Sequence, residues 1–245
     1  MLGTKVYYYP KMNDANMVAA LPDMGNVAGL CMNTLVNKLN AKLFAEIYAY
    51  WPPYVTYKDG LTYYKQSTYR FYHCNDSNLL IFTGDFNPSD PRRLYEVCYE
   101  VVNMAQRLNV KRLYSVGAAL RASVGAEPSI LCAVNKKHLL DYVKAYNNIH
   151  ILEGEGHITG FNGLILGICY ERGIDALCLL GEIDNPEIIQ PRTAKSILTA
   201  LIKILGLKEF SMEELDEEER RKRFMEEQLR YMSSVVDRER HNIYY

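Results

Sequence analysis

The chain has 245 residues, of which 49% are hydrophobic and 23% are charged, and its formal net charge is −1. A chain of this size and composition can bury a full core, either as one large domain or as a domain with an appendage. The small net charge offers no general attraction to nucleic acid or anionic lipid, and no apolar run reaches the roughly 20 residues that cross a bilayer. We therefore expect neither as a partner. The first residues show no secretion signal, which predicts a cytoplasmic protein.

Strand-like apolar runs alternate with helical patterns through most of the chain. The runs expected to form strands are residues 18–22, 41–47, 78–84, 111–117, 129–134, 149–152 and 175–181. Apolar residues at helical spacing predict a helix that follows Ser89 as its N-cap and reaches Leu108, and further helices at 26–40, 136–146, 161–172 and 192–205. Strands that are apolar throughout and alternate with helices are typical of a mostly parallel sheet covered on both faces. The sequence therefore predicts an α/β fold.

Residues 48–72 interrupt this alternation with many tyrosines and the only tryptophan of the chain. A Lys58-Asp59-Gly60 turn within them predicts an aromatic β-hairpin added to the sheet. Such a hairpin either packs on its own domain or forms a subunit contact, because tyrosine and tryptophan combine an apolar ring with a polar tip. For the second alternative, the candidate interface residues are Trp51, Tyr54 and Tyr57.

After Leu207 the chain becomes highly charged, which divides it into an α/β domain at residues 1–207 and a helical tail at residues 208–245. Ser211 and Glu214 have the spacing of a capping box. Four acid-to-base pairs at i, i+4 spacing favour a helix, namely Asp216–Arg220, Glu217–Arg221, Glu218–Lys222 and Glu219–Arg223. A thin apolar stripe accompanies them, formed by Leu215, Met225, Leu229, Met232 and Val236. A largely solvated helix of about 27 residues would reach roughly 40 Å and carry the chain end away from the domain.

Sequence motifs for metal or nucleotide chemistry are absent. The six cysteines and five histidines are scattered without ligand spacing, so we expect no metal. The chain lacks the glycine-rich phosphate-binding motifs and the nucleophile elbow, and we expect no cofactor and no catalytic residue. Polar residues and glycines do stand where strands should end, which is where open α/β sheets bind ligands. These candidate pocket residues, which are also typical of turns and helix caps, are Asp23, Asn26, Gly84, Asp85, Gly117 and Glu182.

Three segments resemble the archaeal homologues of the second subunit of the proteasome assembly chaperone. They read LPDMGNVAGLCMNTLVNKL, LLIFTGDFNPSDP and, with the most specific match, GHITGFNGLILGICYERGIDALCLLGE. The resemblance extends over about residues 14–207. It implies an α/β sandwich similar to the nucleoside phosphorylases, without an established catalytic site, and a role as an assembly factor.

The resemblance gives weight to the last three residues, Ile243, Tyr244 and Tyr245. Proteasome activators and assembly factors dock through a C-terminal hydrophobic residue, a tyrosine and any last residue, and this ending is similar. A single short tail binds weakly, so avidity requires several tails on a homo-oligomer of more than two subunits.

We therefore expect a non-enzymatic assembly chaperone or adaptor that binds the α-ring of the 20S proteasome. One alternative is a phosphorylase-like enzyme or small-molecule-binding protein that uses the strand-end residues. Another is an oligomer whose tails are sequestered until an adaptor protein governs their exposure.

Overall fold

The computed structural model describes residues 2–49, 55–64 and 66–242. Its strands are β1 (Leu2–Val6), β2 (Asn16–Ala19), β3 (Lys42–Ala49), β4 (Thr56–Lys58), β5 (Leu61–Tyr63), β6 (Ser67–Cys74), β7 (Leu79–Gly84), β8 (Arg112–Leu120), β9 (Ile130–Val134), β10 (Ile149–Ile151) and β11 (Asp175–Ile183). Its helices are the short η1 (Met24–Asn26), α1 (Val27–Lys38), α2 (Pro91–Arg107), α3 (His138–Lys144), α4 (Gly160–Glu171), α5 (Pro191–Leu205) and α6 (Glu213–Asn242).

One large mixed sheet forms the centre of the described chain, with nine strands in the order β1-β3-β6-β7-β2-β8-β11-β9-β10. The central strands β7, β2, β8 and β11 run parallel, and Met17 of β2 pairs with both Leu80 and Leu113. On one side β6, β3 and β1 continue the sheet in antiparallel pairs. On the other side β9 is antiparallel to β11, and β10 is parallel to β9. The predicted α/β class is confirmed, with a parallel centre and antiparallel additions.

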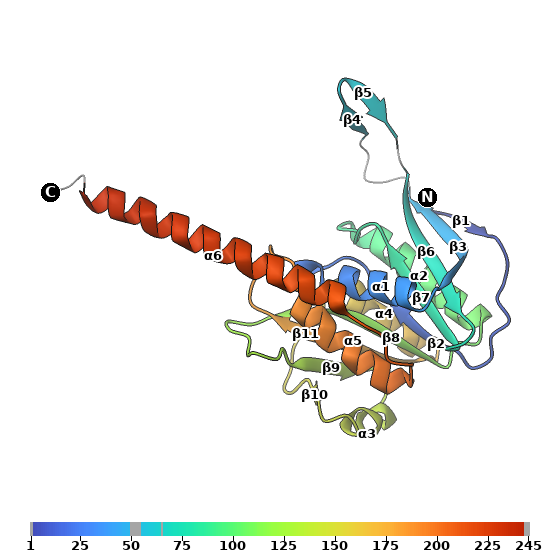
Figure 1. Cartoon of the computed structure of the whole chain (residues 1–245). Helices are drawn as coiled ribbons and strands as arrows, with labels where there is room; N and C mark the ends of the chain where they lie inside the picture. The colour runs from blue at the N-terminus through green and yellow to red at the C-terminus, as the bar shows by residue number, and fades with distance from the viewer. Residues whose placement is uncertain (1, 50–54, 65, 243–245) are drawn as a thin grey trace.

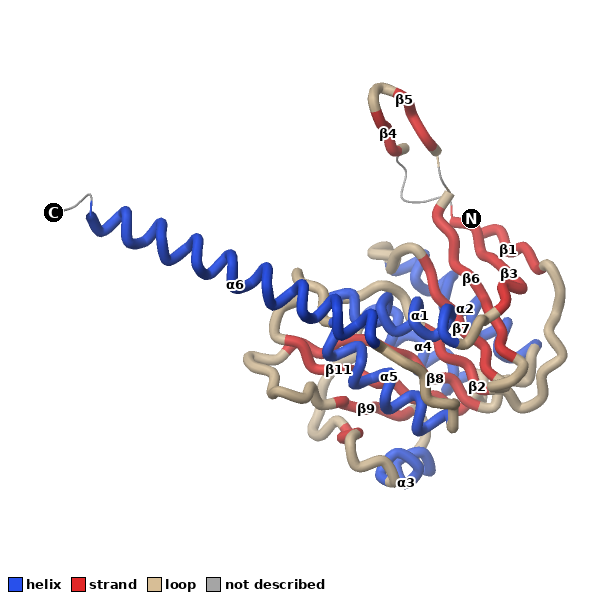
Figure 2. The backbone as a smooth tube through the Cα atoms, viewed as in Figure 1, coloured by secondary structure: helices blue, strands red, loops and turns tan. Residues whose placement is uncertain are grey.

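Helices cover both faces of the parallel centre, as Figures 1 and 2 show. Successive strand residues point to opposite faces, so Met17 and Ala19 of β2 join the core beneath α2 and α4. Val18 joins the second core, which contains residues of α1 and α5. Apolar strands are required here because both of their faces are buried.

Several boundaries differ from the sequence expectation. The expectation of Ser89 as N-cap is wrong by one residue, because the Asp90 side chain accepts hydrogen bonds from the N–H groups of Arg92 and Arg93. Pro91 at the first helical position fixes the start of α2 there, since its backbone is already helical and it has no N–H to satisfy. Strand β1 lies in a part of the chain for which no strand was expected.

The aromatic segment divides into two parts. The turn at Lys58-Asp59-Gly60 is confirmed, and Asp59 and Gly60 both have positive φ, as the mirror-image hairpin turn requires. Strands β4 and β5 form a separate two-stranded sheet instead of joining the large one, whereas β6, within the same aromatic segment, does join it. Figure 1 shows this hairpin standing off the body.

Candidate functional site

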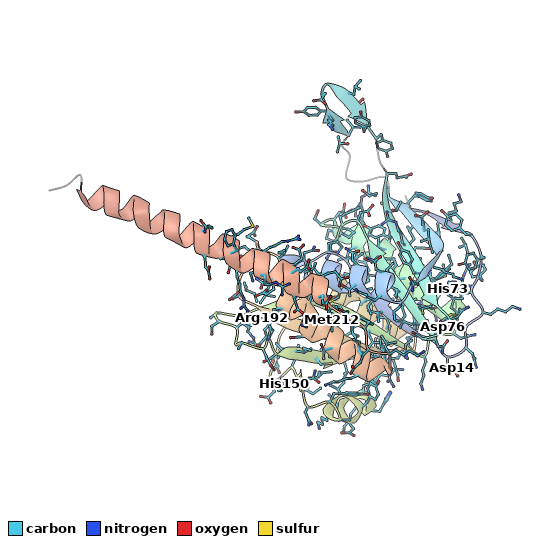
Figure 3. The ribbon with its side chains drawn as sticks, in the orientation of Figure 1. Asp14, His73, Asp76, His150, Arg192 and Met212 are labelled. Carbon is cyan, nitrogen blue, oxygen red and sulfur yellow. The ribbon has the colours of Figure 1, made fainter. Side chains whose placement is uncertain are left out.

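The base of α6 is fixed to the body by one buried leucine and by side-chain contacts. Leu215 is only 4% exposed and belongs to the core beneath α1 and α5. Lys195 of α5 contacts Asp216 at 2.6 Å, and Lys38 of α1 contacts Glu214 at 2.5 Å. Lys222 Nζ donates to Gln190 Oε1 at 2.8 Å. Figure 3 shows Met212, which directly precedes α6, close to the body.

The charged pairs of α6 take two roles. Of the expected i, i+4 pairs, Glu217–Arg221 and Glu219–Arg223 form, at 3.9 Å and 3.0 Å. Asp216 and Lys222 instead contact residues of the body, as described above. Ser211 Oγ accepts from the Glu213 N–H at 3.3 Å, and Glu214 pairs with Lys38, which differs from the reciprocal capping box.

Beyond this base, α6 extends away from the body (Figure 1). Phe224 and Met225 are 63% and 65% exposed. The helix is 30 residues long, and at 1.5 Å per residue it spans roughly 45 Å. The candidate docking residues Ile243, Tyr244 and Tyr245 follow it and lie outside the described residues. The described helix therefore places residue 242 far from the body.

The aromatic hairpin does not pack on its own domain over its described residues. Tyr57 is 80% exposed, and Val55, Leu61, Tyr63 and Tyr64 are all more than half exposed. The other two candidate interface residues, Trp51 and Tyr54, lie outside the described residues. The exposure of Leu61 could not be predicted from the sequence, because an apolar residue after a turn is as typical of a core contact as of an exposed position.

Four of the six candidate pocket residues line one of two hollows near the carboxyl ends of the parallel strands, and Gly117 and Glu182 line neither. Asp23 lines a hollow of about 500 Å³ together with Asn87, Arg121, His157 and the first residues of α4. We call this the strand-end hollow. Its apolar wall includes Leu131, Leu152, Phe161 and Leu180. The loop residues after β7 and before α4 lie in two of the segments that carry the family resemblance, but no binding motif identified them as lining.

Two buried polar atoms distinguish the strand-end hollow. Asp23 Oδ1 accepts from the Ala28 N–H at 2.8 Å, whereas its Oδ2 is buried with no hydrogen-bond partner among the described residues. Burial raises the pKa of Asp23 to about 7. Asn162 Oδ1 is likewise buried and without a partner within the described chain. Glu182 does not line this hollow but pairs with Arg121 at 3.1 Å.

Asn26, Gly84 and Asp85 line a second hollow of about 380 Å³. Arg70 donates to Asp85 there at 2.8 Å, so the carboxylate of Asp85 pairs with a residue of its own chain.

Packing explains Gly84, the last residue of β7, and Gly117, which lies inside β8 and not at the strand end expected from the sequence. A Cβ on Gly84 would lie 2.1 Å from Tyr69 Cδ1, and one on Gly117 would lie 2.1 Å from Asn162 Nδ2. Close approach of a neighbouring side chain therefore requires glycine at both positions.

The described residues contain no group of histidine, cysteine or acidic side chains that could hold a metal ion. His73 and His150, for example, lie in different parts of the body (Figure 3). All six cysteines are free and buried, and burial raises the pKa of the Cys178 thiol to about 12, so that thiol is protonated at neutral pH. Among the described residues, no helix is both long and apolar enough to cross a membrane.

Three similar proteins cover nearly the whole chain. PbaB of Pyrococcus furiosus, described as an archaeal proteasome activator, has a crystal structure that is 30% identical, covers 95% of this chain and 98% of its own, and superposes with a TM-score of 0.80. PbaA of the same organism, described as an archaeal homologue of proteasome-assembly chaperone, is 24% identical with a TM-score of 0.74, and the match covers 98% of this chain and 100% of its own. An uncharacterized protein of Methanocaldococcus jannaschii is 27% identical over 92% of this chain and 90% of its own.

The family comparison agrees with these similarities. The model of the PAC2 family matches residues 17–230, which include the parallel centre, all helices from α1 to α5, and the anchored base of α6. The protein belongs to the PAC2 family.

Proposed function

We propose that the protein is a non-enzymatic, homo-oligomeric proteasome assembly chaperone or adaptor of the cytosol, which binds the α-ring of the 20S proteasome through Ile243, Tyr244 and Tyr245. Family membership supports the proteasome-related role, as does 30% identity over nearly the whole chain to a protein described as an archaeal proteasome activator. In this proposal residues 1–207 form the body and residues 208–245 present the docking tail.

The observation that carries the proposal is the projection of α6. The helix is held through Lys222 and then leaves the body, so its end is available to a partner. A C-terminal carboxylate can pair with a basic pocket, Tyr244 supplies apolar area with a hydroxyl group, and Ile243 can fill a neighbouring apolar site.

Binding to purified α-rings tests the docking tail. Deleting residues 243–245 should leave the melting temperature unchanged and abolish binding, because these residues follow a solvated helix. Tyr244→Ala should weaken each contact about 30-fold, from the loss of about 2 kcal/mol or more for a central aromatic residue. Asn242→Ala is the matched control and should bind as the wild type does. One residue added after Tyr245 tests the carboxylate alone.

A truncated protein that binds α-rings as tightly as the intact one would refute docking through the C-terminus. The oligomer is tested separately by light scattering. Replacing Trp51 and Tyr54 with serine should weaken self-association if the aromatic hairpin is a subunit contact. A monomer at micromolar concentration would remove the avidity on which the proposal depends.

A second candidate function is small-molecule binding in the strand-end hollow. It is favoured by the unpaired buried oxygens of Asp23 and Asn162, since buried polar atoms ordinarily have partners. A ligand that bound there would raise the melting temperature of the wild type and not that of Asp23→Leu. An adaptor protein that controls access to the tails is compatible with either function.

A further inference from the structure

Strand β1 leaves one edge of the large sheet open. It is the outermost strand on its side, and its five residues contain no proline and a single charge, Lys5. The opposite edge strand, β10, has only three residues. Natural proteins blunt exposed edges with very short strands, proline, bulges or charged side chains, lysine especially, because an open edge pairs readily with another strand. Among the described residues, β1 is the longer of the two edge strands, and Lys5 is its one protection of this kind.

The hydrogen-bonding direction of each β1 residue follows from one contact. Tyr7 N donates to Phe44 O at 2.8 Å, which continues the antiparallel register of β1 with β3. Backbone groups alternate in direction along a strand, so Gly3, Lys5 and Tyr7 direct their N–H and C=O groups to β3. Leu2, Thr4 and Val6 therefore direct theirs outward, to the open edge.

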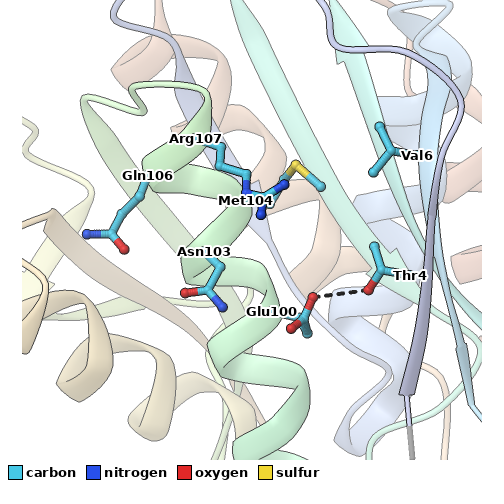
Figure 4. A pocket seen from close by; sticks show the side chains of 7 residues that line it. All are labelled: Thr4, Val6, Glu100, Asn103, Met104, Gln106 and Arg107. Atoms are coloured by element: carbon cyan, nitrogen blue, oxygen red, sulfur yellow. Dashed lines mark hydrogen bonds between the residues drawn. The ribbon is translucent and has the colours of Figure 1, made fainter.

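A hollow of about 530 Å³ lies between β1 and α2 (Figure 4). Thr4 and Val6 line it from β1, and Thr4 Oγ1 donates to Glu100 Oε2 of α2 at 3.0 Å. Thr4 and Val6, whose side chains lie on the side of β1 that faces the hollow, also direct their backbone N–H and C=O groups to the open edge. A strand added to the edge would thus place every second side chain over the same face of the sheet, beside the hollow.

We propose that β1 pairs antiparallel with β1 of a second copy, with the two Thr4 residues facing each other on the twofold axis. In this register Thr4 faces Thr4, which is a favourable cross-strand pair, and position 2 faces position 6 of the other copy. Lys5 faces Gly3 of the other copy, so the two lysines, which carry the only charges of the paired strands, do not face each other. The outward groups of Leu2, Thr4 and Val6 supply all the hydrogen bonds, which leaves the β1–β3 pairing intact. A second copy fits this edge because the strand is complementary to itself in charge, side-chain size and hydrogen-bonding direction.

The pairing also gives the aromatic hairpin a neighbour. The hairpin follows Ala49, which pairs with Leu2, so it begins at the N-terminal end of β1. In an antiparallel pair the C-terminal end of the second β1 lies at this same end of the sheet. Tyr7 of the second copy, whose side chain is 44% exposed, would therefore lie near Ala49, the last described residue before the hairpin. This contact rests on the homo-oligomer of the proposed function but not on its docking tail. Because it is twofold, the number of subunits is even.

Cysteine cross-linking tests the register directly. Facing residues of a hydrogen-bonded antiparallel pair have Cα atoms about 5.5 Å apart, within the range of a disulfide. Thr4→Cys in the full chain should therefore form a disulfide-linked dimer under mild oxidation. Lys5→Cys is the matched control, because the two Cα atoms at position 5 would be roughly 8 Å apart, beyond disulfide reach. The six native cysteines are buried, and the oxidised wild type shows how much disulfide-linked dimer they form without the added cysteine.

Light scattering tests the same contact without a cross-link. Thr4→Pro removes an outward N–H that the β1–β3 pairing does not use, so the particle mass should fall at least twofold with an unchanged circular dichroism spectrum. Thr4→Val keeps the N–H and should keep the mass. Failure of Thr4→Cys to exceed the Lys5→Cys background, an unchanged mass for Thr4→Pro, or an odd number of subunits in the wild type would overturn the pairing. The effect of deleting residues 243–245 on α-ring binding, whatever it is, changes none of these results. The β1 pairing and the docking tail can therefore be refuted independently.

Discussion

Replacing Leu215 with alanine should release the base of α6. The side chain is 4% exposed, and a buried leucine-to-alanine change costs about 2–5 kcal/mol. Phe210 and Met212 are only partly buried beside the same core and can move into the space that the leucine leaves. The loss of stability should therefore lie at the lower end of this range, at about 2–3 kcal/mol. The ion pair of Asp216 is partly exposed and contributes about 1 kcal/mol or less, and the carboxylate of Glu214 is exposed to solvent. Leu215 is therefore the main apolar contact that holds the helix, beside the hydrogen bond from Lys222 to Gln190.

Hydrogen exchange measures this release at the helix itself. A loss of 2–3 kcal/mol should speed exchange at the amides of residues 213–222 by roughly 30- to 150-fold if they exchange by opening of the helix base. Amides within β8 and β11 should keep their protection, because α6 packs on α5, and α5 in turn packs on β11. Met225→Ala is the matched control, since its side chain is 65% exposed on the same helix. Equal exchange in the two variants would refute the assignment of Leu215 as the anchor.

Three further predictions concern the body of the protein. Burial raises the pKa of Asp23 to about 7, so the native state holds a proton that the unfolded state has lost between about pH 4 and pH 7. Stability should fall as pH rises through this window in the wild type and less in Asp23→Asn; parallel melting curves for the two proteins would contradict this. Gly117→Ala should destabilise by about 1–3 kcal/mol in urea unfolding because its Cβ would meet Asn162, whereas Gly167→Ala, in open space on α4, should stabilise by up to about 1 kcal/mol. ATP with magnesium should leave the melting temperature unchanged, and a saturable shift of several degrees would favour the enzyme alternative.

The apolar runs predicted the centre of the fold well because these strands are buried on both faces. Val18, Ile81 and Leu177, which lie in the expected strands, are fully or almost fully buried, and such strands leave a continuous apolar signature in the sequence. Strand β1 leaves no such signature. Its sequence, LGTKV, is short and mixes polar with apolar residues, because Thr4 and Lys5 are exposed at the edge of the sheet. Its place depends on pairing with β3, which lies more than 35 residues away along the chain.

The candidate pocket was only partly predictable for a related reason. Sequence order indicates that Asp23, Gly84, Gly117 and Glu182 each follow or end a strand, but not which strands are neighbours. The observed order β7-β2-β8-β11 places Asp23 in one hollow and Gly84 in the other. Gly84 and Gly117 are explained by the side chains of Tyr69 and Asn162 that cross them, contacts between segments far apart in the chain.

The tail shows how one charge pattern serves two purposes. Acid-to-base pairs at i, i+4 spacing stabilise a helix without burying it, so a helix made of them can extend through water. Near the body, however, Asp216 and Lys222 pair with Lys195 and Gln190, and Leu215 fills the core. The same stretch is thus fixed in direction at its base and independent of the body beyond it. On the oligomer proposed above, a helix fixed in direction at its base would hold the proposed docking tails in defined positions, which would raise their effective concentration. That arrangement is what multivalent docking requires, and the anchor at Leu215 is the contact on which it depends.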